Sequence, residues 1–146
     1  MQLRSFEVNM SFHYDLVDGV IIQRNTKGYG KEFIRDWNDY KRGFGDVNGN
    51  IYWMGLDDIH KLTTSFNHSL EIHLKKRGVT KIVRWSFFMV GSESEQYKEL
   101  TSGFDASTSG LENELEYSEI GRNLNLIEGP IFGSINYDAS TMILKR

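Results

Sequence analysis

The stretch "DWNDYKRGFGDVNGNIYWMGLDDIH", residues 36–60, combines five aspartates, four glycines and five aromatic residues. Just before and within it, apolar residues recur at spacings of three and four, which predicts a helix with one buried face and an end at Gly43. The residues of that face, expected to lie on the core, are Phe33, Ile34, Trp37, Tyr40 and Lys41. The remaining question is whether the aspartates carry chemistry or shape the backbone.

The second half of the stretch predicts a hairpin followed by a helix. Asn48-Gly49 is a dipeptide that tolerates positive φ at both central positions of a tight hairpin turn. After it, "LDDIHKLTTS" predicts a short helix that begins with Asp57 or Asp58 as its cap and is buried through Ile59 and Leu62. In these assignments the aspartates only form turns and cap helices.

Strands flank this segment on both sides. "VDGVIIQR", residues 17–24, is rich in β-branched residues, and "STMILKR" closes the sequence as another strand. Between them, "SLEIHLKKRGVTKIVRWSFFMV", residues 69–90, predicts a hairpin turning at Gly78. "SESE" at residues 92–95 is a capping box that favours a short helix through Leu100, and "GFDASTSG" is expected to be a loop.

Alternation assigns the faces of the two hairpin strands. In the first strand, Leu70, Ile72 and Leu74 face the core, while Glu71 and His73 face away, so we expect a solvated imidazole at His73. The second strand is apolar on both faces, so it is either covered twice or leaves an apolar patch exposed. Its first face comprises Val83, Trp85, Phe87 and Met89, and its second comprises Ile82, Phe88 and Val90.

Composition limits the class of protein. The protein has 146 residues, 39% of them hydrophobic, which suits one domain spanning residues 1–146. A net charge of −3 gives no broad footprint for nucleic acid, and the basic run "KKRG", residues 75–78, is expected to be a solvated hairpin tip. No apolar run is long enough to span a bilayer, so we expect no membrane partner. The absence of cysteine excludes disulfides and thiolate chemistry.

Neither a metal site nor a catalytic site stands out. Asp46, Asn48 and Asn50 supply oxygens at the first, third and fifth positions of a calcium loop, but Ile51 and Asp57 stand where that loop needs Gly and Glu. The four histidines, His13, His60, His68 and His73, lack a spacing that places two ligands on one helix face. No nucleophile elbow, phosphate loop or metal-protease helix is present. We therefore expect neither a cofactor nor an enzyme.

The ordered motifs resemble the fibrinogen C-terminal domain family. They are "FEVNM", "DGVIIQR", "FIRDWNDYKRGFGDVNGNIYWMGLDDIHKLT", "LEIHL" and "VRWSFFMVGSESEQY", with fainter agreement at "NLNL" and "STMILKR". The resemblance implies an α+β fold, a twisted antiparallel sheet with short helices. It also implies that Asp46 and Asp57 cap, turn and orient backbone, with Trp37, Tyr40, Phe44 and Trp53 forming the core around them.

The sequence departs from the family's pattern in several places. Its segment between the strand "VRWSFFMV" and the last strand is short, and neither the family's aspartate-rich calcium loop nor its cysteine-bounded pocket for acetylated sugars has a counterpart. Gly19 stands where the family places a Trp, and a family cysteine is missing near Asn9 and Met10. The resemblance therefore implies a reduced domain without either activity.

Apolar residues at unusual positions supply the candidate partner site. The family usually has polar residues at Phe87 and Met89, so the strip that they form with Trp85 either binds a partner or is covered by a rearranged loop or helix. Residues 122–133 are too apolar for a free loop and are expected to fold back over core surface. The candidate partner-binding residues are Trp85, Phe87, Met89, Ile127, Ile131 and Phe132.

The leading interpretation is a non-enzymatic protein-interaction module, with a protein partner or a second copy of the same protein. The alternative is a calcium-independent lectin-like recognition domain, for which a glycan partner is possible but unsupported by any motif. The resemblance implies an extracellular location, whereas a native start at Met1 and the loss of cysteines and calcium loop favour an intracellular one.

Overall fold

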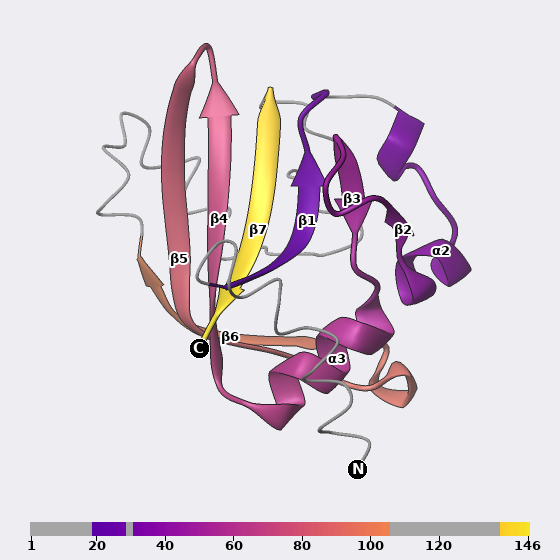
Figure 1. Ribbon diagram of the computed structural model, residues 1–146. Helices are drawn as coiled ribbons and strands as arrows, with labels where there is room; N and C mark the ends of the chain where they lie inside the picture. The colour runs from indigo at the N-terminus through magenta and orange to yellow at the C-terminus, as the bar shows by residue number, and fades with distance from the viewer. Residues whose placement is uncertain (1–18, 29–30, 106–137) are drawn as a thin grey trace.

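The computed structural model describes residues 19–28, 31–105 and 138–146. These residues form a seven-stranded sheet in the order β2-β3-β1-β7-β4-β5-β6, and every neighbouring pair is antiparallel (Figure 1). The strands are β1 (Val20–Asn25), β2 (Phe44–Gly45), β3 (Ile51–Trp53), β4 (His68–Lys76), β5 (Val79–Val90), β6 (Glu99–Asp105) and β7 (Ala139–Lys145). The helices are η1 (Lys31–Phe33), α2 (Trp37–Arg42), α3 (Leu56–Ser65) and η2 (Glu93–Glu95). The α+β class and the twisted antiparallel sheet expected from the sequence are confirmed.

The closing strand β7 lies in the middle of the sheet. Leu144 pairs with Val20 of β1 on one side and with Leu70 of β4 on the other. The two neighbours of β7 therefore come from distant parts of the sequence, and β7 joins them into one sheet. Because β7 satisfies backbone groups on both its edges, the pairing stabilises the β1 and β4 parts together.

The β4–β5 hairpin follows the predicted alternation over most of its length. Leu70, Ile72 and Leu74 are at most 1% exposed. The strands are connected by Arg77 and Gly78, which have φ of 52° and 80° and form the two-residue turn whose twist matches a hairpin. This hairpin is the part of the fold that alternation and turn chemistry predict most directly.

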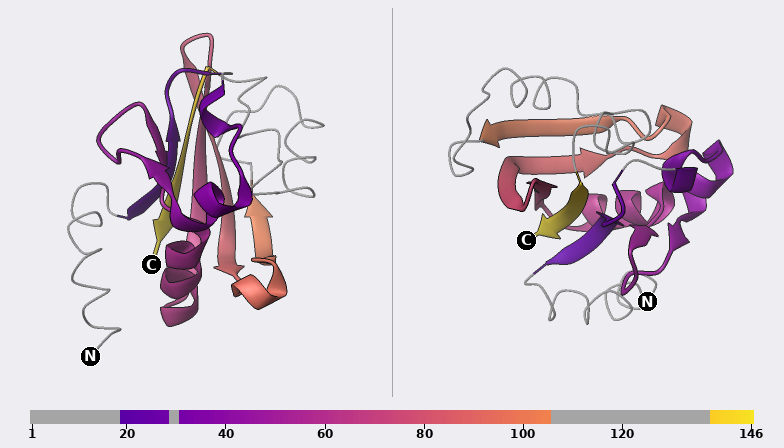
Figure 2. Two further views of the ribbon diagram at one scale, coloured as in Figure 1. Left: turned by 90° about the vertical axis from the view of Figure 1, so that its right-hand side faces the viewer. Right: turned by 90° about the horizontal axis from the view of Figure 1, so that it is seen from above.

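Helix α3 packs on the buried face of the sheet, at the end where β4 begins (Figure 2). Ile59 and Leu62 are buried as predicted. Two hydrogen bonds attach the helix to the last residue of β5: Val90 N donates to Thr63 Oγ1 at 3.0 Å, and His60 Nδ1 lies 2.8 Å from the Val90 carbonyl oxygen. The helix is therefore held by polar contacts to β5 as well as by apolar burial.

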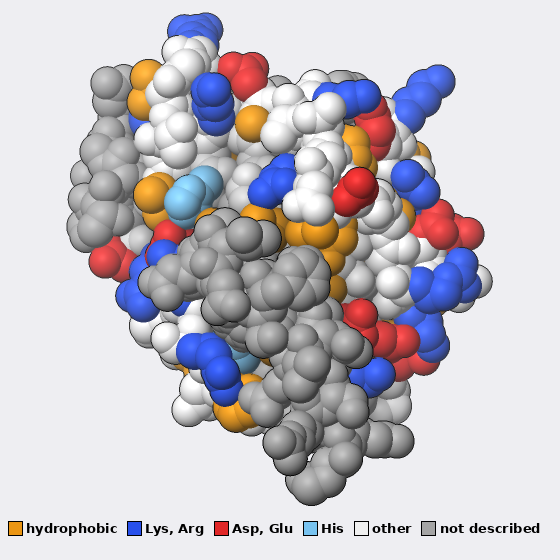
Figure 3. Space-filling view, in the orientation of Figure 1, with side chains coloured by type: hydrophobic (Ala, Val, Ile, Leu, Met, Phe, Trp, Pro, Cys, Tyr) orange, Lys and Arg blue, Asp and Glu red, His pale blue; other side chains and the backbone are white. Residues whose placement is uncertain are grey.

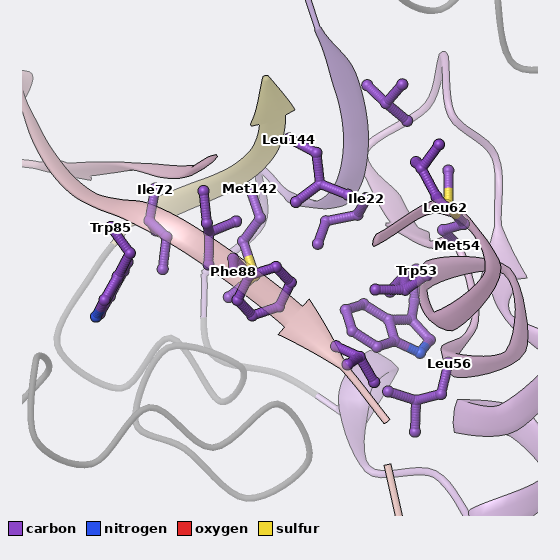
Figure 4. Packing of buried hydrophobic residues seen from close by; sticks show 14 of the residues in the cluster. Ile22, Trp53, Met54, Leu56, Leu62, Ile72, Trp85, Phe88, Met142 and Leu144 are labelled. Atoms are coloured by element: carbon purple, nitrogen blue, oxygen red, sulfur yellow. The ribbon is translucent and has the colours of Figure 1, made fainter. Parts of the chain in front are cut away.

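The core lies between α3 and this face of the sheet (Figure 4). Trp53 is fully buried, and its indole N–H donates to the Tyr40 carbonyl at 2.8 Å, which satisfies the one polar atom of the ring. The Tyr40 hydroxyl in turn donates to the Phe33 carbonyl at 2.6 Å. These linked contacts tie η1, α2 and β3 to the core.

The predicted helix over residues 33–41 is broken in two. Asp36 starts a new helix, because its carboxylate accepts the Asp39 N–H at 2.9 Å as an N-cap. The interruption leaves Ile34 69% exposed and Trp37 43% exposed. The prediction that both lie on the core is therefore wrong, whereas burial of Phe33 and Tyr40 and the end of α2 at Gly43 are confirmed.

The turn between β2 and β3 differs from the predicted type. Gly49 N–H donates to the Asp46 carbonyl at 2.8 Å, so Val47 and Asn48 occupy the central positions, and neither Asn48 nor Gly49 has a positive φ. The Asp46 carboxylate accepts the Asn48 N–H at 2.9 Å and stabilises the turn. Asp46 thus shapes backbone, as the resemblance implied.

Two other local predictions need correction. Helix α3 is capped by Gly55 without a side-chain hydrogen bond, so neither Asp57 nor Asp58 is its cap. The predicted helix after the capping box is one turn, η2, because Gln96 and Tyr97 both take positive φ and end it. Strand β6 then begins at Glu99 and continues to Asp105, where the sequence predicted a helix end and a loop.

Two glycines with nearly equal φ provide a test of the tight β2–β3 connection. Gly45 has φ +81° and a Cβ there would lie 2.1 Å from the Ile51 carbonyl oxygen, whereas Gly78 has φ +80° and a Cβ would meet nothing within 4 Å. Replacing Gly78 by Ala should cost about 1 kcal/mol from left-handed strain alone. Gly45→Ala should cost about 3 kcal/mol, since backbone must also shift. Equal losses in denaturant unfolding would contradict the close approach of β2 to β3.

Candidate interaction surface

A β-bulge in β5 decides which apolar side chains face the core. The pairing Leu70↔Trp85 becomes His68↔Phe88 two residues earlier in β4, so Ser86 and Phe87 together lie opposite one residue, Ser69. Relative to β4, the extra residue shifts the alternation of β5 by one, and the burial of its side chains follows this shift. Before the bulge Trp85 is buried, and after it the buried residues are Phe88 and Val90.

The bulge separates the three residues predicted to form one strip. Trp85 is 1% exposed and lies on the core face, in contact with Phe104 at a ring-centroid distance of 5.0 Å. Phe87 and Met89 lie on the opposite face and are half-buried. The prediction that Trp85, Phe87 and Met89 share one face is therefore wrong, because strict alternation does not continue through residues 86–87.

Phe87 and Met89 instead share a surface with β6, the strand at the edge of the described sheet. Met89 pairs with Leu100, which is 45% exposed, and Phe87 pairs with Ser102, which is also exposed. We call Phe87, Met89 and Leu100 the β5–β6 patch. The sequence signal for Leu100 was missed because residues 92–100 were expected to be helical.

A polar cluster holds the connection between β5 and β6 in place. Lys41 Nζ of α2 lies 2.6 Å from Glu93 Oε1, and the Trp37 indole N–H donates to Glu93 Oε2 at 3.3 Å. The Tyr97 hydroxyl donates to Asp57 of α3, and the Tyr97 ring lies 5.5 Å from the Trp37 ring. Asp57 thus orients Tyr97, and the connection that positions the β5–β6 patch is attached to both helices.

The indole of Trp85 has an unusual environment. Its nitrogen points away from Phe88 and the rest of the labelled core cluster (Figure 4), and it is buried without a hydrogen-bond partner among the described residues. A buried N–H left unpaired costs about 1–3 kcal/mol.

The other predicted partner-binding residues lie outside the described part of the protein. They are Ile127, Ile131 and Phe132. The expected fold-back of residues 122–133 lies outside it too.

His73 is paired, contrary to the expected solvated imidazole. Its Nε2 lies 2.9 Å from Glu71 Oε1, and Lys145 Nζ lies 3.1 Å from Glu71 Oε2. Partial burial opposes ionisation of Glu71, but hydrogen bonds from His73 and Lys145 outweigh it and hold the pKa of its carboxyl below the ordinary value. Acidic, basic and histidine side chains are interspersed on the surface shown in Figure 3.

The described residues contain no group of three or more His, Asp or Glu side chains placed to hold a metal ion. The Asp46 carboxylate, which supplies the first oxygen of the weak calcium-loop match, accepts the Asn48 N–H.

In the part of the protein that the structure describes, no helix is long and apolar enough to cross a membrane. Among the ion pairs of these residues, Lys41–Glu93 joins α2 to η2, and Lys145–Glu71 joins β7 to β4.

Gly19 has a steric role that explains one departure from the family's pattern. A Cβ at this position would lie 2.5 Å from the Leu144 carbonyl oxygen and 2.8 Å from Ile143 Cγ2. A Trp there would require β7 to move away from the start of β1. The close approach of these strands and the small residue at position 19 therefore belong together.

Comparison with known proteins places these features in context. A sequence model described as the C-terminal globular domain of fibrinogen beta and gamma chains matches residues 2–144. Angiopoietin-related protein 1 of Mus musculus is 39% identical over 79 residues, which cover 53% of this chain and 16% of that protein. The sequence thus spans well under two thirds of this relative's length.

Solved structures show the same fold. The fibrinogen-like globe domain of human ANGPTL2 superposes with a TM-score of 0.65, covering 86% of this chain and 78% of that one, at 19% sequence identity. A lamprey fibrin D-dimer, complexed with the peptide ligand Gly-His-Arg-Pro-amide, superposes with a TM-score of 0.55 at 27% identity. That similarity covers 60% of this chain and 28% of the lamprey protein chain.

Calcium should not change the stability of this protein. A metal that binds only the native state raises its melting temperature by mass action. Melting curves in millimolar calcium and in excess chelator should therefore overlap. A clear upward shift with calcium would show that a site exists despite the missing loop.

The buried His68 should make the fold sensitive to mild acid. Burial disfavours the charged ring, the Phe66 carbonyl at 2.7 Å from Nδ1 partly opposes this effect, and nearby Arg146 adds to it, so the pKa of His68 is lowered. The unfolded state then takes up the proton more readily than the native one. The contribution of neutral His68 to the free energy of unfolding is fully present above the unfolded pKa of about 6.5 and falls as pH decreases below it.

The measurement is the denaturant midpoint between pH 7.5 and pH 5.5. We expect the midpoint of the wild-type protein to fall over this range, and the fall to be smaller in a His68→Gln variant. His73→Gln is the control, because it removes an imidazole while keeping His68. An identical fall in the His68→Gln variant would assign the acid sensitivity to other groups.

Proposed function

Because this protein belongs to the family defined by the C-terminal globular domain of fibrinogen beta and gamma chains, we propose that it acts as a non-enzymatic protein-interaction module. The observation that carries this proposal is the β5–β6 patch, where the bulge turns Phe87 and Met89 out of the core beside the exposed Leu100. Apolar side chains gathered on the surface of a sheet are typical of protein contact sites.

The energetics of the patch suit a contact site. Burying a side chain such as Phe or Met against a partner is worth about 1.5–3 kcal/mol. Two such residues beside Leu100 are therefore sufficient to act as hot spots in a well-packed interface. The ion pair between Lys41 and Glu93 and the attachment of Tyr97 to Asp57 hold the neighbouring connection, which limits the ordering cost of binding.

One of the similar solved structures supports a protein or peptide partner. The lamprey fibrin structure contains a peptide ligand, and at 27% identity its likeness to this protein extends beyond general fold. The described histidines His60, His68 and His73 bond to backbone carbonyls or to Glu71, so the proposal assigns them structural roles and includes no catalytic step. An extracellular location, which the family resemblance implied, is part of the proposal.

The test replaces Phe87 and Met89 together by Ser. Both side chains lie on the face away from the core, so we expect the double variant to retain wild-type far-UV circular dichroism and a cooperative unfolding transition. Self-association in sedimentation velocity, and capture of protein partners on the immobilised domain, should fall at least tenfold. The matched control is Ile34→Ser, which removes an apolar side chain that is 69% exposed and distant in sequence from the patch.

Three outcomes would contradict the proposal. Unfolding of the double variant would show that the patch is part of the core. A folded double variant that still associates would place the partner elsewhere. Glycan-array binding that persists in chelator and is unaffected by the double substitution would favour the calcium-independent lectin-like alternative.

A further inference from the structure

A second surface lies at the turn of the β4–β5 hairpin, far along the strand from the β5–β6 patch. Lys75, Lys76 and Arg77 follow one another there, and all are exposed. We call these residues the basic tip. The hairpin turn projects beyond the ends of the neighbouring strands (Figure 1), and basic side chains stand at the same end of the molecule in Figure 3. The protein as a whole has a net charge of −3, so this concentration of positive charge is local.

The three side chains of the basic tip form no ion pair with an acid in the described part of the protein. By contrast, Lys41, Arg35 and Lys145 each lie within 4 Å of a carboxylate. Asp138, which immediately precedes β7, contacts the backbone of the tip: its Oδ2 accepts the Arg77 N–H at 2.8 Å, and its own N–H donates to the Lys75 carbonyl at 2.8 Å. One carboxylate beside three cations leaves the tip with a net positive charge.

The shape of the tip constrains the kind of anion that fits. Successive strand residues point to opposite faces, so Lys75 and Lys76 project from the two sides of the hairpin while Arg77 lies in the turn itself. The two-residue turn fixes this arrangement. A flat acidic patch on a folded protein meets one side of the hairpin only, whereas a flexible polymer with many anionic groups passes over the turn and meets all three cations.

We propose that the basic tip binds a sulfated polysaccharide. The window of residues 75–81 contains four basic residues, a density typical of heparin-binding segments. A lipid bilayer fits less well, because the tip offers one small exposed apolar side chain, Val79, and stable membrane attachment requires a larger apolar or lipid anchor. This binding is independent of the β5–β6 patch and would add a matrix-attachment function to the interaction module.

The experiment uses the whole protein on immobilised heparin with a salt gradient. The test variant combines Lys75→Gln, Lys76→Gln and Arg77→Asn. Asn is chosen because Arg77 has φ 52°, a conformation that Asn followed by Gly adopts readily, so the turn should be preserved. The control variant combines Lys31→Gln, Lys61→Gln and Lys98→Gln, three exposed lysines elsewhere, and has the same net charge as the test variant.

We expect the wild-type protein and the control variant to be retained at low salt, and the test variant to emerge with the void volume. For three released counterions, the logarithm of the affinity should fall against the logarithm of salt concentration with a slope of about −2 to −3. Retention of the test variant, or equal loss in the control variant, would overturn the proposal. Tip-dependent binding to phosphatidylserine vesicles without binding to heparin would also overturn it and assign the tip to membranes.

Discussion

The placement of β7 between β1 and β4 is the constraint on which the described sheet depends. Without it, the sheet would separate into a β2-β3-β1 part and a β4-β5-β6 part, each with an additional unpaired edge. The joining is polar as well as apolar, because fully buried Gln23 donates to Ser140 Oγ at 2.9 Å beside the packed Met142 and Leu144. The close contact of Gly19 with Leu144 belongs to the same junction. Pairing strands so far apart in the sequence closes a long loop of the chain, so the burial and backbone pairing at β7 must offset the entropy lost on loop closure.

The bulge in β5 connects the architecture to the proposed function. One additional residue at Ser86–Phe87 keeps Trp85 and Phe88 on the same buried face while turning Phe87 and Met89 to the other. An uninterrupted strand would place Phe87 and Met89 on the face of Trp85, and Phe88 on the other face. The apolar surface beside Leu100 is therefore a product of strand geometry. At the opposite end of β5, Asp138 accepts the Arg77 N–H, and the side chains of the basic tip form no ion pair with any of the described residues.

The sequence by itself determined the features that depend on local chemistry. These are the β4–β5 hairpin with its Arg77-Gly78 turn, the buried side of α3, the closing strand and the membership of the fibrinogen family, which many ordered motifs indicate together. Period and turn residues are readable within a short window, and the order of the motifs is readable along the sequence without any knowledge of contacts. Periodicity also predicted the burial of Tyr40, and the family resemblance implied that of Trp53.

Where local rules compete, only the tertiary structure decided which of them holds. The N-cap at Asp36 outweighed helical periodicity and left Ile34 and Trp37 exposed, and Gly55 displaced the aspartates as the cap of α3 because the backbone approaches Arg42 there. The β5 bulge and the Glu71–His73 pair depend on which strands are neighbours, and side-chain alternation along one strand carries no information about its neighbours. The candidate site was therefore predicted in part, as Phe87 and Met89, while its separation from Trp85 and its extension to Leu100 required the register of β4, β5 and β6.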